Sequence, residues 1–182
     1  MSKKKLFIAI GHGKSVDGSW DAGCTYGKYT EADLMKPITI AEVAYLRGSG
    51  IEVYTDAPSN NKNMIADVKW ANKLGVDGYQ SNHCDYRKAP KGTMPLATST
   101  RGRKIAACLN KEVMKGMGMK TRGISTREDL YELNSTNMPA VIFETGSIKA
   151  DLGKLKKAER YGKCLAKGWC KYLGVKFTGK RK

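Results

Sequence analysis

Four side chains of this sequence combine residue types that can hold a metal ion and move a proton. They are the two histidines of the chain, His12 and His83, and two of its glutamates, Glu31 and Glu144. Two imidazoles and one carboxylate are the ligand set of a catalytic zinc site that leaves its fourth position to water. Such a site also needs a carboxylate that is not a ligand, as proton acceptor and donor. The four residues therefore indicate metal-assisted hydrolysis.

An open α/β sheet would bring these residues together. Five short apolar runs predict strands, at Leu6–Ile10, Ile51–Thr55, Gly78–Ser81, Thr93–Ala97 and Ala140–Phe143. The two histidines and Glu144 follow the first, third and fifth of these runs. Ligands of open α/β sheets bind beyond the carboxyl ends of the strands, so parallel strands would bring these three side chains to one crevice. Glu31 would reach the same crevice from the start of a helix.

Helices are predicted between the strands. Thr30 is placed as an N-cap with Asp33 three residues on, and its helix would run toward Arg47, with Pro37 expected to kink it or delay its start. Apolar residues at helical spacing predict three more helices, over residues 64–74, 105–117 and 155–173. Alternating strands and helices predict an α/β fold: a single three-layer domain with a central, mostly parallel, twisted sheet flanked by helices.

Each candidate residue also has a structural interpretation. A single histidine after a strand is more often hydrogen-bonded than metal-bound, and Glu31 would also favour the positive end of a helix dipole. Glu144 is harder to explain in this way, because a carboxylate that ends an apolar strand is costly to bury unless it is paired or functional. Placement alone therefore leaves both interpretations open.

Length and composition limit the class of protein. The chain has 182 residues, 41% of them apolar, which fits one globular domain with a real core. No apolar run approaches the roughly 20 residues of a membrane-spanning helix. The run of five apolar residues after the basic start is shorter than the ~7–15 residues of a signal-peptide core. We therefore expect no membrane span, and synthesis in the cytosol without a signal peptide.

The charge balance predicts a polyanionic partner. Thirty-three basic and 17 acidic residues give a net charge of +16, a surplus that fits nucleic acid, an acidic membrane surface or an anionic wall polymer. From residue 154 onward, 11 basic residues stand against Glu159 alone. The sequence shows no zinc-knuckle spacing and no aromatic–basic RNA signature. We therefore expect no nucleic-acid partner, and a non-enzymatic nucleic-acid-binding protein is the weaker alternative.

The cysteines are interpreted as reduced and structural. There are five, at positions 24, 84, 108, 164 and 170, and none forms a CxxC motif. An odd number without that motif argues against a disulfide framework. Cys84 stands beside His83, but neighbouring residues on an extended segment point to opposite faces, which disfavours a cysteine–histidine nucleophile.

Several motifs resemble one known family. They are the segment that ends in His12, the turn Asp21–Gly23, the helix start at Glu31, the segment Ser81–Asp85 and the long block Asp129–Gly146. Together they are similar to the zinc-dependent N-acetylmuramoyl-L-alanine amidases of the type-3 class, which occur in bacterial autolysins and phage endolysins. The departures are Asp67 and Lys69, where the family often has arginine, and the loop Lys14–Tyr29.

The resemblance implies a fold and an activity. It implies a sheet of about six strands in a catalytic domain over residues 1–175, followed by a basic tail over residues 176–182. His12, Glu31 and His83 would hold one Zn²⁺, and Glu144 would accept the proton of the attacking water and pass it to the leaving amine. The substrate would be bacterial peptidoglycan, cut at the amide bond between N-acetylmuramic acid and L-alanine. The protein would act on the cell wall after its release from the cytosol.

Further roles are assigned less firmly. Asn82 and Thr145 flank the catalytic positions and are candidates for substrate contact, and Asp85 is a candidate for orienting a metal-binding histidine. The basic C-terminal face would anchor the protein to anionic wall polymers. The main alternative activity is that of a zinc carboxypeptidase or endopeptidase that cuts the stem peptides of peptidoglycan.

Overall fold

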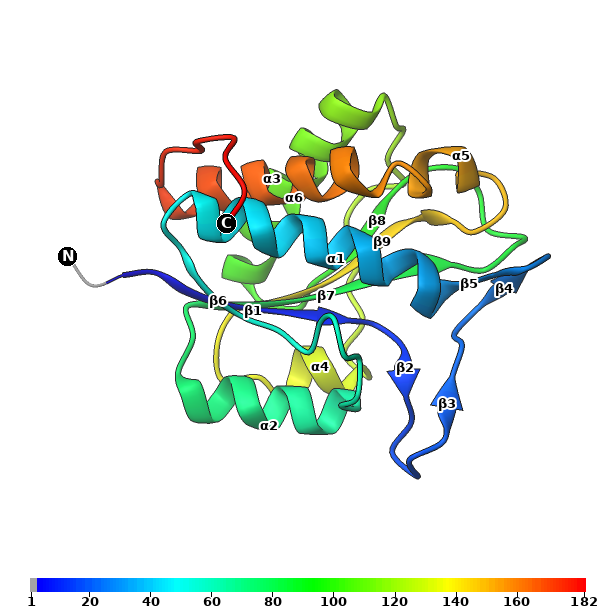
Figure 1. The fold of residues 1–182 in the computed structure, drawn as a ribbon, viewed down its shortest axis with the longest axis horizontal. Coiled ribbons are helices and arrows are strands. Elements are labelled where there is room, and N and C mark those ends of the chain that lie inside the picture. Colours follow the sequence, from blue (N-terminus) through cyan, green and yellow to red (C-terminus); the bar gives the residue numbers. More distant parts are fainter. Residues whose placement is uncertain (1–2) are drawn as a thin grey trace.

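A five-stranded sheet runs through the centre of the computed structural model, which describes residues 3–182 (Figure 1). Its strand order is β6 (Glu52–Tyr54), β1 (Lys5–Ile10), β7 (Gly78–Asp85), β9 (Ala140–Ser147) and β8 (Met94–Leu96). The first four strands are parallel, and β8 pairs antiparallel with β9. The expected mostly parallel α/β sheet is confirmed with five strands instead of about six, and all five predicted runs form it.

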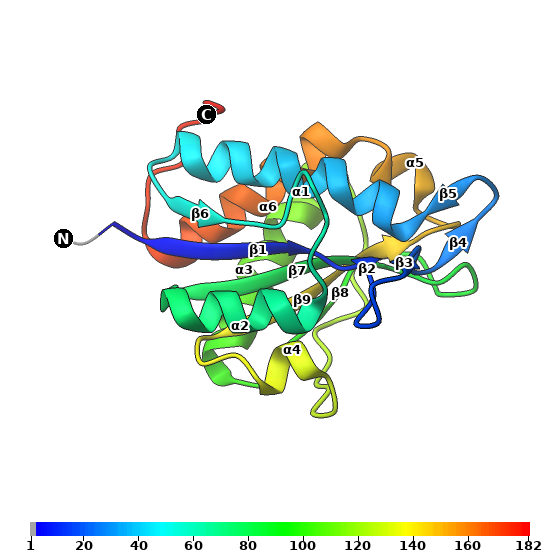
Figure 2. The same ribbon diagram turned by 60° about the horizontal axis from the view of Figure 1, so that its bottom comes forward.

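Helices cover both faces of the sheet (Figure 2). One face carries α1 (Glu31–Gly48), α3 (Thr100–Met117), α5 (Leu152–Leu155) and α6 (Ala158–Leu173), and the other carries α2 (Met64–Leu74) and α4 (Tyr131–Asn134). Strand β1 shows why both faces of the sheet must be covered. Leu6, Ile8 and Ile10 pack in one buried cluster, while Phe7 and Ala9 pack in the other. Alternate residues of a strand face opposite sides of its sheet, which gives three layers.

The helices follow the sequence pattern with two differences. Thr30 caps α1 as predicted, since its side chain accepts a hydrogen bond from the backbone N–H of Asp33, and Pro37 lies inside the helix without delaying its start. The helix predicted over residues 155–173 is divided, because α5 ends at Leu155 and α6 begins at Ala158. The short helix α4 was not predicted. Among residues 3–182 we find no helix with the length and hydropathy to cross a membrane.

Strands β7 and β9 extend further than their apolar runs. Each continues past the predicted end, so that His83 lies within β7 and Glu144 within β9. The two residues are direct neighbours in the parallel register of these strands. The sheet itself therefore places the second histidine beside the second candidate glutamate.

The segment between β1 and α1 forms two small ribbons. Strand β2 (Gly13–Lys14) pairs with β3 (Trp20–Asp21), and β4 (Thr25–Tyr26) pairs with β5 (Tyr29–Thr30), both antiparallel. These four strands form separate ribbons beyond the carboxyl end of β1 and do not join the main sheet (Figure 1). They position Asp21 and Cys24 next to the start of α1, as the hydrogen bonds below show.

The last residues lie along helix α1. The Thr178 backbone N–H donates to the Ser49 hydroxyl, the Thr178 hydroxyl donates to the Gly48 carbonyl, and the Lys182 N–H donates to the Ala44 carbonyl. The segment 176–182 is thus hydrogen-bonded to the domain. The predicted division at residue 175 stays a prediction.

Candidate active site

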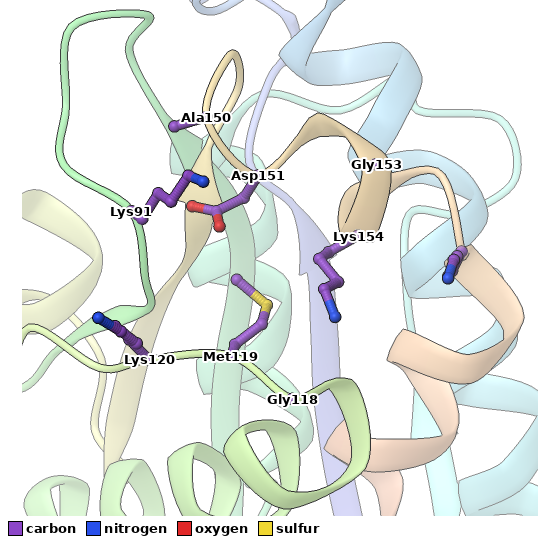
Figure 3. A pocket seen from close by; sticks show the side chains of 9 residues that line it. Lys91, Gly118, Met119, Lys120, Ala150, Asp151, Gly153 and Lys154 are labelled. Atoms are coloured by element: carbon purple, nitrogen blue, oxygen red, sulfur yellow. The ribbon is translucent and has the colours of Figure 1, made fainter.

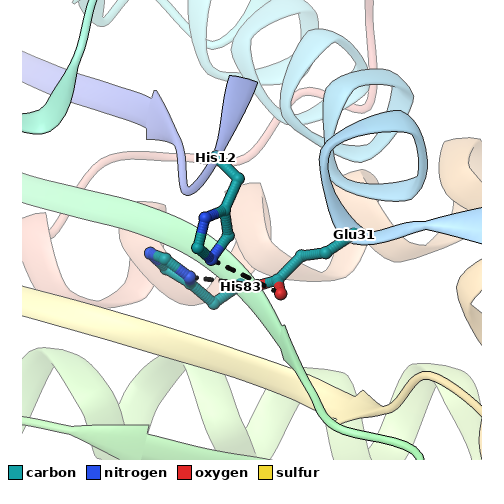
Figure 4. Close-up of side chains that lie close together, drawn as sticks. All are labelled: His12, Glu31 and His83. Carbon is teal, nitrogen blue, oxygen red and sulfur yellow. Dashed lines mark hydrogen bonds and ion pairs between the residues drawn. The ribbon is translucent and has the colours of Figure 1, made fainter. Parts of the chain in front are cut away.

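Three of the predicted residues meet beyond the carboxyl end of β1. Glu31 reaches both imidazoles from one side, with its Oε2 3.4 Å from His12 Nε2 and its Oε1 3.0 Å from His83 Nδ1 (Figure 4). One ligand atom from each residue lies within 4.8 Å of the others. The structure thus brings together a cluster whose members are 19 and 52 residues apart. His12 follows the end of β1, Glu31 begins α1 and His83 lies on β7.

Two glycines leave the space that this cluster occupies. A Cβ atom on Gly11 would lie 2.4 Å from His83 Cε1. A Cβ atom on Gly23, whose φ is +64°, would lie 2.6 Å from both Glu31 Oε2 and His12 Cδ2. Contacts this short are not tolerated in packed interiors, so any larger residue at these positions would displace the imidazoles or the carboxylate.

Glu31 is buried and held as an anion. The backbone N–H groups of Cys24 and Cys84 donate to its Oε2 and Oε1, at 3.0 and 2.9 Å. Burial alone would raise the pKa of Glu31, but the hydrogen bond and charge of His83, the charge of His12 and the Cys24 N–H lower the pKa to about 2. The residue therefore presents a negative charge to both imidazoles.

The outer nitrogen of each imidazole faces a carboxylate. His12 Nδ1 lies 2.8 Å from Asp21 Oδ2, and His83 Nε2 lies 3.7 Å from Glu132 Oε2. Glu132 in turn accepts a hydrogen bond from the Tyr79 hydroxyl. A hydrogen-bonded carboxylate such as Asp21 orients a histidine that binds a metal and fixes its tautomer, whereas Glu132 lies beyond hydrogen-bond distance of His83 and faces it as a nearby negative charge. Sequence reasoning missed both carboxylates, because no local pattern marks which acid meets a distant imidazole.

Asp85 forms an ion pair with an arginine. Its carboxylate pairs with Arg122 at 2.8 Å, and the histidine-facing carboxylates are those of Asp21 and Glu132. The parallel pairing of β7 with β9 is irregular between His83 and Asp85, so the two residues do not follow one regular register. The structure thus shows Asp85 paired with Arg122, and its role in orienting a metal-binding histidine stays a prediction.

Asn82 and Thr145 are fully buried next to the candidate site residues His83 and Glu144. The Asn82 amide donates to Thr39 and Glu42 of α1, and the Thr145 hydroxyl donates to the His83 carbonyl at 2.7 Å. Asn82 precedes His83 on β7, and Thr145 follows Glu144 on β9. Neighbouring residues of a strand point to opposite faces of the sheet. These hydrogen bonds are all within the protein, and the substrate contacts of the two residues stay a prediction.

Glu144 lies in an open cleft beside His83. Both residues line a cavity of about 400 Å³ whose walls include Leu96, Leu130 and Ile142. Burial raises the pKa of Glu144 to about 7; the His83 and Arg122 charges oppose the shift, and those of Glu31 and Asp85 add to it. Its Oε2 has no hydrogen-bond partner within residues 3–182. A carboxyl group in this state can both accept and donate a proton near neutral pH.

Comparison with known proteins places this arrangement in a family. The model of the N-acetylmuramoyl-L-alanine amidase family matches residues 6–171. An uncharacterised 38.4 kDa protein of Clostridium perfringens is 34% identical over 129 residues, a stretch that covers 65% of this chain and 37% of that protein. The chain thus spans little more than a third of the length of this relative.

Solved structures share the fold. The N-acetylmuramoyl-L-alanine amidase AmiC2 of Nostoc punctiforme superposes with a TM-score of 0.84 at 21% identity, over 95% of this chain and 98% of that one. The amidase of Clostridium difficile 630 gives 0.82 at 22%, over 94% and 97%. The catalytic domain of the CD27L endolysin, which targets C. difficile, gives 0.76 at 23%, over 91% and 96%.

These likenesses agree with the site geometry and with the family model. At such low identity the structural matches establish the fold alone. The family model, in contrast, extends from β1 to α6 and therefore includes every element that contributes to the cluster. The chain belongs to the N-acetylmuramoyl-L-alanine amidase family.

Proposed function

We propose that the protein is a zinc-dependent hydrolase of bacterial peptidoglycan that cuts the amide bond between N-acetylmuramic acid and L-alanine. One observation carries the proposal beyond family membership. The cluster of His12, Glu31 and His83 lies beside Glu144, and Glu144 and His83 share one open cleft. This arrangement provides a metal-ligand set and a separate acid/base in one place.

The residues of the cluster fit zinc. Two imidazoles and a buried carboxylate are the donor types of a catalytic zinc site, and the outer nitrogens already face Asp21 and Glu132. His12 Nε2 and His83 Nδ1 point toward Glu31, so these two nitrogens would be the ligand atoms. When bound, zinc would supply Lewis acidity that polarises the scissile carbonyl and acidifies a water molecule.

Glu144 would carry the protons. Its carboxylate accepts a proton from the attacking water and then donates it to the amine of L-alanine as that group leaves. A pKa near 7 suits both steps, and the buried Oε2 has no hydrogen-bond partner within residues 3–182 that would compete for the proton. Leu96, Leu130 and Ile142 give the cleft an apolar wall against which a stem peptide would lie.

Metal content tests the ligand assignment. The purified protein should contain about one zinc per chain, because the cluster offers three protein ligands. The variants His12→Ala and His83→Ala should lose zinc and wall hydrolysis together. Full zinc occupancy in both variants would contradict the assignment.

The alternative activity differs in the bond that is cut. A zinc carboxypeptidase or endopeptidase would use the same chemistry within the stem peptides, and nothing in the cleft favours that choice over the family's own reaction. An amidase releases intact stem peptides that begin with L-alanine and leaves unsubstituted glycan. Mass spectrometry of digested peptidoglycan separates these outcomes.

A basic pocket supports an additional contact with anionic wall polymers. Lys91, Lys120, Lys154 and Lys157 line a cavity of about 490 Å³ (Figure 3). The carboxylate of Asp151 also lines this pocket, and it accepts hydrogen bonds from the backbone N–H groups of Gly92 and Ser147. Only Lys154 and Lys157 belong to the C-terminal region that the sequence predicted to be basic. Lys91 and Lys120 come from two other segments, so the positive charge is not confined to that region. We propose that this pocket helps hold the protein on the wall, where its substrate lies.

A further inference from the structure

Two cysteines that the proposed chemistry does not use lie next to each other at the active site. Cys24 lies between β3 and β4, and Cys84 lies on β7, 60 residues further along the chain. Their Sγ atoms are 3.8 Å apart, and Cys24 Sγ also lies 3.3 Å from the Cys84 carbonyl oxygen. Both are free thiols in the structure.

We propose that Cys24 and Cys84 are a modification site, where a low-molecular-weight disulfide such as oxidised glutathione drives formation of a reversible protein disulfide. The proposal deepens the proposed function, because the bond would form beside the metal ligand Glu31. It would fasten the ribbon segment to the sheet when the protein passes from a reducing to an oxidising surrounding.

The exposure of the two thiols sets the order of the steps. Cys24 is half-buried, while Cys84 is only 3% exposed, so the oxidant meets Cys24 first. The Cys24 sulfur attacks one sulfur of the oxidant, whose S–S bond breaks, and one glutathione leaves with the Cys24 proton. The Cys84 sulfur then attacks the Cys24 sulfur, and the second glutathione leaves with the Cys84 proton. Two protein thiols are oxidised, and one small disulfide is reduced to two thiols.

The closure needs a short movement. A disulfide bond is ~2.05 Å long, so the sulfurs must approach from their 3.8 Å separation. Cys84 is a buried residue of β7 that lies at the irregular step in the pairing of β7 with β9, whereas Cys24 lies half-buried in the turn between two short ribbons. We therefore expect the Cys24 segment to make most of this movement.

The bond would act on the metal ligand through the backbone. The N–H groups of these two cysteines are the donors to the two carboxylate oxygens of Glu31. A covalent link between the cysteines keeps both donors together and so restrains the carboxylate they hold. We therefore expect the oxidised protein to release zinc to a chelator more slowly than the reduced protein does.

Thiol counting on the full chain tests the proposal. After treatment with oxidised glutathione and denaturation, titratable thiols should fall from five to three (5 − 2), and dithiothreitol should restore them. Peptide mapping should show one cross-linked pair that contains Cys24 and Cys84, lighter by two hydrogen atoms. Five remaining thiols, glutathione adducts alone, or a pair that involves another cysteine would overturn the proposal. Because peptide mapping is done on the wild-type protein, it tests the proposal even if a variant folds poorly.

Variants and zinc release complete the experiment. Cys24→Ser should lose the cross-link, whereas Cys108→Ser, which changes an equally half-buried cysteine on α3, should keep it. Oxidation should slow zinc release in the wild type and in Cys108→Ser but not in Cys24→Ser. Equal release rates before and after oxidation of the wild type would refute the restraint on Glu31. Thiol counting and peptide mapping use neither zinc nor wall hydrolysis, so the failure of this proposal is distinguishable from the failure of the proposed function.

Discussion

Two carboxylates in the same site are held in opposite states by their surroundings. Glu31 has its pKa lowered to about 2 by His83, His12 and a backbone N–H, against the effect of burial. Glu144 has its pKa raised to about 7, chiefly by burial. A pair of acids with such separated pKa values marks a division of roles. Glu31 is suited to bind a cation, and Glu144 is suited to exchange protons.

Replacing Glu144 separates proton transfer from metal binding. Glu144→Gln keeps the shape of the side chain but cannot accept a proton, so kcat should fall by at least ~100-fold. Zinc content should match the wild type, because Glu144 is not among the three clustered residues, and the variant should stay folded. Loss of zinc from a folded Glu144→Gln protein would make Glu144 a ligand instead.

The space left by Gly23 gives a second prediction. Gly23→Ala should lose zinc, because the new Cβ would meet Glu31 and His12 at 2.6 Å. Gly27→Ala is the matched control, since Gly27 has a similar φ of +58° but no atom within 4 Å of the added Cβ. The control carries only the backbone strain of about 1–2 kcal/mol. Equal zinc content in the two variants would show that the contact at Gly23 is unimportant.

At the scale of elements, a buried polar network joins α1 and α6 to the sheet. Glu42 Oε2 accepts hydrogen bonds from Gln80 and Asn82, and Gln80 accepts one from the Trp169 indole. Burial raises the pKa of Glu42 to about 8, despite the two amide donors. A protonated carboxyl group at this position removes the cost of a buried charge.

This raised pKa predicts how stability depends on pH. Below about 4.5, the ordinary pKa of glutamate, Glu42 is protonated in the folded and unfolded states alike. As the pH rises toward 8, the unfolded chain loses this proton first, so the free energy of unfolding falls. Glu42→Gln should remove this fall and stabilise the protein at pH 7 by about 1–3 kcal/mol.

Denaturant unfolding at pH 5 and pH 8 measures the effect. The exposed Glu128 provides the control, since Glu128→Gln changes the same functional group outside the core. The Glu42 account fails if both variants show the pH dependence of the wild type.

Sequence reasoning found the elements but not all of their polar contacts. Apolar periodicity located the five strands and the four long helical segments, because each must bury one or both faces. It ended the third strand before Asn82 and His83, since polar residues do not signal a buried strand. Both residues have hydrogen-bond partners on α1. Those of Asn82 are about 40 residues earlier in the chain, too far for a local pattern to indicate them. Likewise, the edge of a parallel sheet predicted the meeting of His12 and His83 but not the contact with Glu132.

At the scale of the whole molecule, the net charge of +16 should attach the protein to an anionic wall. Screening length falls from ~10 Å at 0.1 M salt to ~3 Å at 1 M, so pelleting with intact walls should weaken sharply over that range. Hydrolysis of a small soluble muropeptide should change much less. Wall binding that is indifferent to salt would leave the basic surface as a solvated face only.

Charge reversal tests whether the lysine pocket contributes specifically. Changing Lys91, Lys120 and Lys157 to glutamate should reduce wall binding and spare the soluble substrate. The matched control reverses three exposed lysines outside the pocket, Lys69, Lys73 and Lys104. It changes the net charge by the same amount. Equal losses from both triple variants would assign the attraction to overall charge instead of to the pocket.

Product analysis with controlled metal content tests the central claim most directly. Purified peptidoglycan is digested with zinc-loaded protein, with chelator-treated protein and with treated protein given zinc again, and new amino termini are identified by mass spectrometry. We predict L-alanine at the start of intact stem peptides with the loaded protein, none after chelation, and recovery on adding zinc. Cleavage within the stem peptides while the muramyl–alanine bond stays intact would contradict the account, as would L-alanine release that persists without metal.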